Sequence, residues 1–269
     1  MFYSGVSGLN TLPFTERQHF CLSKDYSNGM KFRSHISDYI GYCQSLISKM
    51  DLLDNNQKFI RKLLLDGIKI DTAYDIGAYK GVWTRSLKYI IPNAEFILFE
   101  ANSSHEPELK KTKSRYFLEV LSDTENNRQW WTNSSTGDSL FRESQDIYEN
   151  LKPVVKRTRT LDSILSEFNL PLPDLIKIDV QGAELEVLRG GALAVNYSSI
   201  VILELPILEY NIGAPKISEC LDFMRANNFV PIELLEVHKA GEFLVQIDVG
   251  FVRKEVALKH YAVEGKFFV

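Results

Sequence analysis

Acidic residues follow the ends of several short apolar runs, and this pattern could do chemistry. We expect each run to be a strand, and the residues at the strand ends are Asp75, Glu100, Asp123, Asp179 and Glu204. In an open α/β sheet, ligands bind at the carboxyl ends of the strands. Carboxylates accept hydrogen bonds from hydroxyl groups and attract cations. The pattern therefore predicts a ligand site along one edge of a sheet, although acidic residues are also common in such loops.

The stretch Thr72–Gly81 predicts a strand, a glycine turn and the start of a helix. Gly77 provides either a positive φ or room for a ligand beside the backbone, and Gly81 allows close packing of the helix. With Ala78, the turn places free backbone N–H donors at a helix N-terminus. The Gly-Lys-Ser/Thr ending of a P-loop and the middle glycine of a dinucleotide fingerprint are both missing. Because Asp75 would repel a pyrophosphate, the turn favours a cationic, hydroxyl-bearing ligand such as S-adenosylmethionine (SAM); a plain βα turn is the alternative.

Two further strand ends could bind the adenosine part of such a ligand. Glu100 lies 25 positions after Asp75 (100 − 75), where an acidic residue accepts hydrogen bonds from both ribose hydroxyls. The alternative for Glu100 is an exposed carboxylate without a ligand. Asp123, next to Ser122, could accept a hydrogen bond from the adenine amino group, and capping a turn is its alternative role.

Lys177, Asp179 and Glu184 form a third candidate group. Lys177 and Asp179 are two positions apart on one predicted strand, so they project to the same side. Asp179 and Glu184 flank the following turn and could converge on one ligand. A carboxylate there could deprotonate a hydroxyl nucleophile, or the pair could hold a divalent metal that lowers its pKa. A structural ion pair of Lys177 with Asp179 or Glu184 is the competing interpretation.

The histidines do not indicate a metal site. The five residues are His19, His35, His105, His238 and His260, and they show no metal-ligand spacing. His238, between the last two predicted strands, is the only candidate for a place near a substrate mouth, and a solvated loop histidine is its alternative. No metal-binding residues are therefore assigned from the sequence.

Predicted strands alternate with helices from residue 70 onward. After the strand that ends at Gly77, we predict strands over residues 95–99, 116–121, 154–158, 175–180, 200–203, 229–235 and 243–252, and an inserted hairpin over 128–133 and 139–142. Helical spacing predicts a helix over residues 36–50, and Asp54 with Gln57 is a capping box for another. We therefore predict a helical N-terminal extension, residues 1–66, and one doubly wound, mostly parallel α/β domain, residues 67–269.

Composition narrows the function classes. The chain has 269 residues, of which 45% are hydrophobic and 25% charged, which is typical of globular proteins. A net charge of −4 argues against a protein that coats nucleic acid. The three scattered cysteines suggest no disulfide framework, and no apolar run reaches transmembrane length. We expect a cytoplasmic protein that binds neither membranes nor nucleic acid; the oligomeric state is not indicated.

Several motifs together resemble the FkbM-type SAM-dependent methyltransferases. The most specific is L-I-K-I-D-V-Q-G-A-E-L-E-V-L-R-G-G, residues 175–191. It is preceded by D-I-G-A-Y-K-G (75–81), F-E-A-N (99–102), L-S-D (121–123) and T-L-D (160–162), and followed by V-I-L-E (201–204), Y-N (210–211) and I-D-V-G-F (247–251). The resemblance covers residues 70–253. Tyr79 and Ala101 depart from it, because the family usually has Asn and Pro there.

The resemblance implies a class I methyltransferase fold, with a seven-stranded Rossmann-like sheet whose last strand is antiparallel. It also implies SAM-dependent O-methylation of a small-molecule or sugar hydroxyl. The residues implied for the cofactor are Asp75, Gly77, Ala78, Gly81, Glu100, Ala101, Ser122 and Asp123. Asp179 and Glu184 are implied beside the acceptor, with Lys177 orienting Asp179. The alternatives are a nicotinamide-dependent oxidoreductase, a ribose 2′-O-methyltransferase acting on RNA, and a non-catalytic SAM-binding module.

Overall fold

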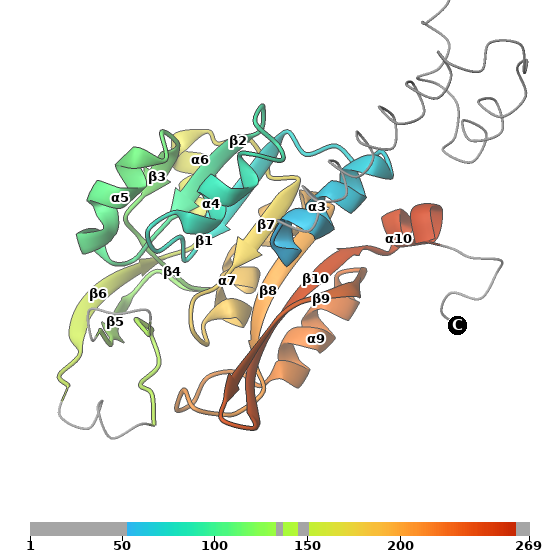
Figure 1. Cartoon of the computed structure of the whole chain (residues 1–269). Helices are drawn as coiled ribbons and strands as arrows, with labels where there is room; N and C mark the ends of the chain where they lie inside the picture. Colours follow the sequence, from blue (N-terminus) through green and yellow to red (C-terminus); the bar gives the residue numbers. More distant parts are fainter. Residues whose placement is uncertain (1–52, 133–136, 145–150, 262–269) are drawn as a thin grey trace, which may run out of the picture. The chain divides into compact units, whose positions relative to one another are not determined.

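The computed structural model describes residues 53–132, 137–144 and 151–261 (Figure 1). From Asp54 onward these residues form one compact unit. The predicted helix over residues 36–50 lies outside the described residues, and the predicted domain boundary at residue 66 stays a prediction. No helix in the described part of the chain is long and apolar enough to cross a membrane.

Seven strands form the main sheet in the order β3-β2-β1-β7-β8-β10-β9 (Figure 1). All neighbouring pairs are parallel except those of β10, which runs antiparallel to both β8 and β9. This order confirms the predicted doubly wound, mostly parallel α/β sheet with a terminal antiparallel pair. The strands are β1 (Thr72–Ile76), β2 (Glu95–Phe99), β3 (Arg115–Phe117), β7 (Leu175–Ile178), β8 (Ile200–Pro206), β9 (Phe229–Ala240) and β10 (Phe243–Arg253).

Helices cover both faces of the sheet and bury one apolar cluster on each. One face carries α3 (Asn55–Leu65), α4 (Val82–Leu87), α5 (Glu106–Lys111), which follows the 3-10 turn η1 (Ser103–His105), and α10 (Lys254–Tyr261). The other face carries α6 (Leu161–Phe168), α7 (Glu184–Gly190), α8 (Ala192–Tyr197) and α9 (Ile217–Ala226). Strand residues alternate between these faces, as the two-residue period of a strand requires.

The capping box predicted at the start of α3 is present. The Asp54 carboxylate accepts a hydrogen bond from Gln57 N at 2.7 Å, and the Gln57 side-chain oxygen accepts one from Asp54 N at 3.2 Å. Both contacts satisfy backbone donors that a helix N-terminus leaves unpaired. The Phe59 ring of this helix packs against Gly250 of β10, so α3 is attached to the sheet.

The same alternation places charged residues on the α3–α4 face, inside the sheet. Tyr74 and Ile76 belong to the cluster on the α6–α9 face, so Asp75 between them points to the other face. Asp75 lies directly opposite Lys177 on β7. Glu204 on β8 lies directly opposite Asp248 on β10. Neighbouring strands thus carry charged side chains near their tips.

A small second sheet corrects one predicted strand. It contains β4 (Val120–Leu121), β5 (Asn127–Trp130) and β6 (Val154–Arg159) in the order β4-β6-β5. The single strand predicted over residues 116–121 was wrong, because the chain leaves the main sheet after Phe117 and Val120 pairs with Thr158 instead. In the predicted hairpin, Trp131 and Ser139 form an antiparallel bridge, while β5 pairs with β6.

Candidate active site

The turn after β1 is held by backbone contacts on both sides. The N–H groups of Gly77 and Ala78 both donate to the carbonyl of Phe99, at 2.9 and 3.0 Å. Gly77 has a φ of +77°, and a Cβ there would lie 1.7 Å from the carbonyl oxygen of Asp179. Of the two roles left open by the sequence, the structure therefore supports the positive φ, and a close approach of protein backbone adds to the requirement for glycine.

Gly81 packs the start of α4 against a neighbouring loop. Its φ is +67°, and a Cβ would lie 2.5 Å from Cγ2 of Thr112. This agrees with the predicted close packing, and Gly81 does not line the cavity described below.

Glu100 is buried beside the turn, at the end of β2. One carboxylate oxygen accepts from Tyr79 N at 2.6 Å, and the other accepts from Asn102 N at 2.7 Å. Burial raises the pKa of Glu100 to about 7, although these two N–H groups offset part of the effect. A carboxylate held this firmly keeps one fixed orientation and still has lone pairs for a ligand.

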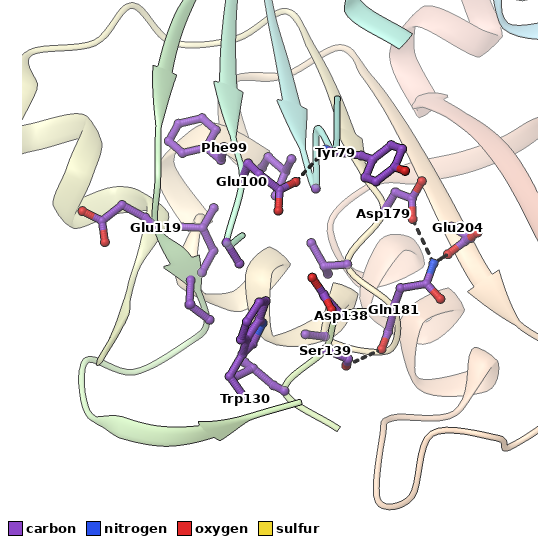
Figure 2. Close-up of a pocket in the computed structure, with 18 of the residues that line it drawn as sticks. Tyr79, Phe99, Glu100, Glu119, Trp130, Asp138, Ser139, Asp179, Gln181 and Glu204 are labelled. Atoms are coloured by element: carbon purple, nitrogen blue, oxygen red, sulfur yellow. Dashed lines mark hydrogen bonds between the residues drawn. The ribbon is translucent and has the colours of Figure 1, made fainter. Parts of the chain in front are cut away.

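A cavity of about 390 Å³ lies at the tips of the strands (Figure 2). Figure 2 shows Glu100 and Trp130 on one side of this cavity and Asp179 and Gln181 on the other. Of the described residues that line it, none is a lysine or an arginine and five are acidic: Glu100, Glu119, Asp138, Asp179 and Glu204. Phe99, Leu121 and Trp130 supply apolar wall. The cavity is therefore suited to a ligand that is cationic, hydroxylated and partly apolar.

A network of ionised and amide groups forms the Asp179 side of the cavity. Lys177 Nζ lies 2.7 Å from Asp179 Oδ2. Gln181 Nε2 donates to Asp179 Oδ1 at 3.2 Å and to Glu204 Oε2 at 2.5 Å. The Lys177–Asp179 ion pair that the sequence offered as one interpretation is thus present. The Asp179 side chain is 29% exposed and that of Lys177 only 9%, so Asp179 is the partner that a ligand can reach.

The charges of this network shift its pKa values in opposite directions. Burial alone would raise the pKa of Asp179, but the ammonium of Lys177 outweighs it and the pKa is lowered. Burial raises the pKa of Glu204, and the neighbouring Asp179 carboxylate raises it further. For Lys177, Asp179 and Asp75 overcome the effect of burial and raise the pKa. Asp179 is therefore ionised at neutral pH, while Glu204 retains a proton.

Glu184 does not converge with Asp179 on a ligand. The side chain is 2% exposed, and its Oε1 accepts from Val180 N at 3.2 Å and from Gly182 N at 3.0 Å. Burial raises its pKa to about 7, in spite of these backbone donors. This position supports the turn between β7 and α7, and it gives no support to the predicted role beside the acceptor or to a metal held by the Asp179–Glu184 pair.

Asp75 also lies outside the cavity. It is fully buried, and its Oδ2 accepts a hydrogen bond from Thr84 Oγ1 at 2.6 Å. Asp75 lines instead a second hollow of about 270 Å³ on the α3–α4 face, as do Gly77, Ala78, Lys177 and Asp179. Of the residues predicted for cofactor and catalysis, the first cavity thus collects Gly77, Glu100, Ala101 and Asp179.

Ser122 and Asp123 do not reach the cavity either. Ser122 is fully buried, and its hydroxyl donates to Glu186 at 2.7 Å. Asp123 follows it, with Oδ1 3.4 Å from the same hydroxyl. The positions of these side chains do not support the predicted contact of Asp123 with adenine, because Val120 and Leu121 of β4 line the cavity and Ser122 and Asp123 do not.

Several residues that line the cavity were not predicted from the sequence. Trp130 ends β5, and Asp138 and Ser139 lie between β5 and β6; all three fall within the region 128–142 that we predicted to hold an inserted hairpin. Ser139 Oγ donates to the carbonyl of Gln181 at 2.6 Å, so the insertion is fastened to the β7–α7 turn. Gln181 itself has a φ of +55°, which is uncommon for a residue with a side chain. The two adjacent tryptophans, residues 130 and 131, were the sequence feature that could have indicated that this region lines the cavity.

The sheet order and the strand-tip cavity define a Rossmann-like methyltransferase fold. Residues 75–231 match the Methyltransferase FkbM domain. Because this match covers more than half of the chain, the chain belongs to the FkbM methyltransferase family. The resemblance inferred from the motifs is confirmed.

The chain is also similar to individual proteins. It is 26% identical over 159 residues to the hexuronic acid methyltransferase AglP of Haloferax volcanii, a match covering 57% of this chain and 63% of that protein. The chain thus spans less than two thirds of that relative's length. A methyltransferase FkbM from Methylobacillus flagellatus KT has a TM-score of 0.43 at 12% identity, over 66% of this chain and 43% of that one. The magnesium protoporphyrin IX methyltransferase ChlM from Synechocystis PCC 6803, solved with SAM bound, has a TM-score of 0.40 at 11% identity, over 89% and 90%.

Proposed function

We propose that this methyltransferase uses SAM to methylate a hydroxyl group of a sugar or another small molecule. The observation that carries the proposal is the charge of the cavity: five carboxyl residues line it, with no lysine or arginine among the described lining residues. A ligand with a sulfonium, an ammonium and two ribose hydroxyls complements such a wall. A dinucleotide pyrophosphate or an RNA phosphate would be repelled by it.

The cofactor end of the cavity, which we define as Gly77, Glu100 and Trp130, fits the adenosine part of SAM. The Glu100 carboxylate is fixed by Tyr79 N and Asn102 N, and its remaining lone pairs can accept the two ribose hydroxyls. The Trp130 ring offers an apolar surface to the adenine. The Lys156 ammonium lies 3.7 Å from the centre of the Trp130 ring, within the range of a cation–π contact.

The acceptor end, which we define as Asp179, Gln181 and Glu204, supplies the base. SAM contributes a methyl group whose bond to sulfur breaks with the electron pair left on sulfur, while the acceptor oxygen forms the new bond to carbon. Asp179 takes the hydroxyl proton, because it is ionised and partly exposed. Lys177 positions Asp179, and Gln181 fixes its second oxygen. The chain otherwise has to align the acceptor with the methyl carbon.

The relative from Haloferax volcanii is named for a sugar acid, and this supports a carbohydrate as the acceptor. Sugar hydroxyls donate hydrogen bonds readily to carboxylates and to the Gln181 side-chain oxygen. An acceptor carboxylate placed directly against the ionised Asp179 would be repelled. A neutral sugar or polyol hydroxyl therefore suits the bare protein groups best.

Calorimetric titration with SAM and with NAD⁺ tests the cofactor. We expect saturable binding of SAM and none of NAD⁺; binding of NAD⁺ alone would contradict the proposal. Incubation with methyl-labelled SAM and a panel of sugars then tests the reaction, with label expected in an ether-linked methyl group. Binding of SAM without transfer to any hydroxyl compound would favour a non-catalytic SAM-binding module.

A further inference from the structure

Three side chains from the last strands of the sheet meet beside the acceptor end. Glu204 on β8 and Asp248 on β10 are direct partners in the strand register, and His238 on β9 lies opposite Gln246, two residues from Asp248. One potential ligand atom from each of the three residues lies within 4.8 Å of the others. His238 Nε2 is 3.5 Å from Asp248 Oδ1. These residues come from separate strands, so the cluster is a product of the fold.

The two buried carboxyl groups of the cluster are only partly stabilised by other protein groups. Glu204 and Asp248 place two carboxyl groups directly opposite each other on neighbouring strands, and both are buried, with Glu204 8% and Asp248 5% exposed, so ionising both without a cation would cost free energy. Asp248 Oδ1 is buried and has no hydrogen-bond partner among the described residues. This oxygen lies 3.5 Å from His238 Nε2, and potential ligand atoms of all three residues lie within 4.8 Å of one another. A buried carboxylate oxygen without a partner costs free energy unless something else binds it.

Protein cations stabilise the cluster only in part. The Lys177 ammonium favours the ionised form of Asp248, but Lys177 is itself paired with Asp179 at 2.7 Å. His238 is 41% exposed and lies between Asp248 and Glu236, at 3.5 and 3.8 Å. A single imidazole therefore faces three carboxyl groups. A small divalent cation would satisfy the free oxygen and neutralise the opposed pair at once.

We propose that Glu204, His238 and Asp248 bind one divalent metal ion. A mixed set of one imidazole and two carboxylates suits a first-row ion such as Mn²⁺ or Zn²⁺ better than Ca²⁺, which takes oxygen ligands. Three protein ligands leave coordination positions open. The site is distinct from the Asp179–Glu184 pair, whose second member supports a turn.

The location gives the ion a role in the proposed reaction, and this step rests on the proposed function. Glu204 and His238 line both the strand-tip cavity and the second hollow, so an ion between them lies in the wall of the acceptor end. Its open positions can bind an oxygen of the acceptor and orient the hydroxyl toward Asp179. The ion would also allow an acceptor with a carboxylate, which the bare acidic wall would repel.

Binding of Mn²⁺ to the full chain, followed by electron paramagnetic resonance without SAM or acceptor, tests the site. We expect one saturable Mn²⁺ per chain. Asp248→Asn and His238→Gln should each weaken binding by at least about tenfold. Glu233→Gln removes an acidic side chain from the same strand β9 outside the cluster, and it should bind like the wild type. His238 is partly exposed, so its variant reports on the site even where Asp248→Asn impairs folding.

No saturable Mn²⁺ in the wild-type chain, or equal binding by wild type, Asp248→Asn and His238→Gln, would overturn the metal site. A SAM titration of the same samples separates the two proposals. Mn²⁺ binding without SAM binding would overturn the proposed function and leave the metal site. SAM binding without Mn²⁺ binding would do the reverse.

Discussion

At the cofactor end of the cavity, Gly77 and Glu100 directly follow the neighbouring strands β1 and β2, and Trp130 ends β5 of the small sheet. At the acceptor end, Asp179 and Gln181 belong to the turn after β7, and Glu204 lies on the adjacent strand β8. Glu100 is fixed by backbone N–H groups next to it in the sequence or in the adjoining turn. Asp179 is fixed by the side chains of Lys177 and Gln181, and Gln181 also contacts Glu204. Backbone N–H groups thus fix the carboxylate at the cofactor end, whereas charged and amide side chains fix the carboxylate at the acceptor end.

This difference teaches how the two ends can vary. A carboxylate held by backbone donors keeps its place whatever side chains surround it. A network of buried charges depends on every member, because removal of one partner leaves another unpaired. Gly77 joins the two ends, since its α-carbon packs on the carbonyl of Asp179 while its N–H bonds to Phe99.

The largest expected effect is a loss of turnover, and it distinguishes the acceptor end of the cavity from the cofactor end. Asp179→Asn should lower turnover by roughly 10²- to 10⁴-fold, because the amide cannot take the hydroxyl proton. SAM affinity should stay near that of the wild type, since Glu100 is untouched. Steady-state kinetics and calorimetry measure the two effects. Asp222→Asn, an exposed change on α9, is the control; unchanged turnover in Asp179→Asn would contradict its role as base.

Gly77→Ala should damage both ends together. The new Cβ would collide with the carbonyl of Asp179 at a positive φ, so we expect the free energy of unfolding to fall by about 3 kcal/mol or more. Gly67 also has a positive φ, +85°, but a Cβ at this position would meet no other atom within 4 Å. Gly67→Ala is therefore the matched control and should cost only about 1 kcal/mol. Equal losses in denaturant unfolding would show that packing on Asp179 is unimportant.

Glu184→Gln tests whether Glu184 supports the turn. The folded chain raises the pKa of Glu184 from 4.5 to about 7, so the folded state holds a proton that the unfolded state has lost between these values. The stability contributed by Glu184 therefore falls as pH rises through that window, by up to about 3 kcal/mol. The variant should lose this decline when unfolding is followed from pH 4.5 to 8. A loss of turnover as large as that of Asp179→Asn would instead place Glu184 at the acceptor end.

Glu100→Gln should weaken SAM binding by roughly 10- to 100-fold, because a charged hydrogen-bond acceptor is replaced by a neutral one. The pKa of Glu100 is raised to about 7, so the wild-type carboxylate ionises as pH rises through 7 and its affinity for SAM should increase. The variant should lack this increase. Calorimetry at pH 6 and pH 8 measures both, and identical pH profiles would argue against ribose binding by Glu100.

Sequence periodicity and motifs predicted most of the main sheet and two residues of the cofactor end, Gly77 and Glu100, but not Trp130. The strand over residues 95–99 and the Gly77 turn are local features, so apolar pattern and glycine position predict them. The strand predicted over residues 116–121 failed because pairing with β6, which comes more than 30 residues later, splits it. Local pattern carries no information about such a distant partner.

The acceptor end was only half predictable for the same physical reason. Lys177 and Asp179 share a strand, and their ion pair follows from the two-residue period. The meeting of Glu204 with Asp248 and His238 depends on the register of three strands, which the sequence does not state. The sequence could not decide the role of Glu184, because a carboxylate after a turn can face a ligand or bind the backbone of the turn, and the hydrogen bonds from Val180 N and Gly182 N appear only in the structure.

A crystal structure of the protein with S-adenosylhomocysteine tests the central claim most directly. We predict the ribose hydroxyls within hydrogen-bond distance of the Glu100 carboxylate, the adenine against Trp130, and the sulfur facing Asp179. A ligand bound elsewhere, or one whose ribose makes no contact with Glu100, would contradict the account.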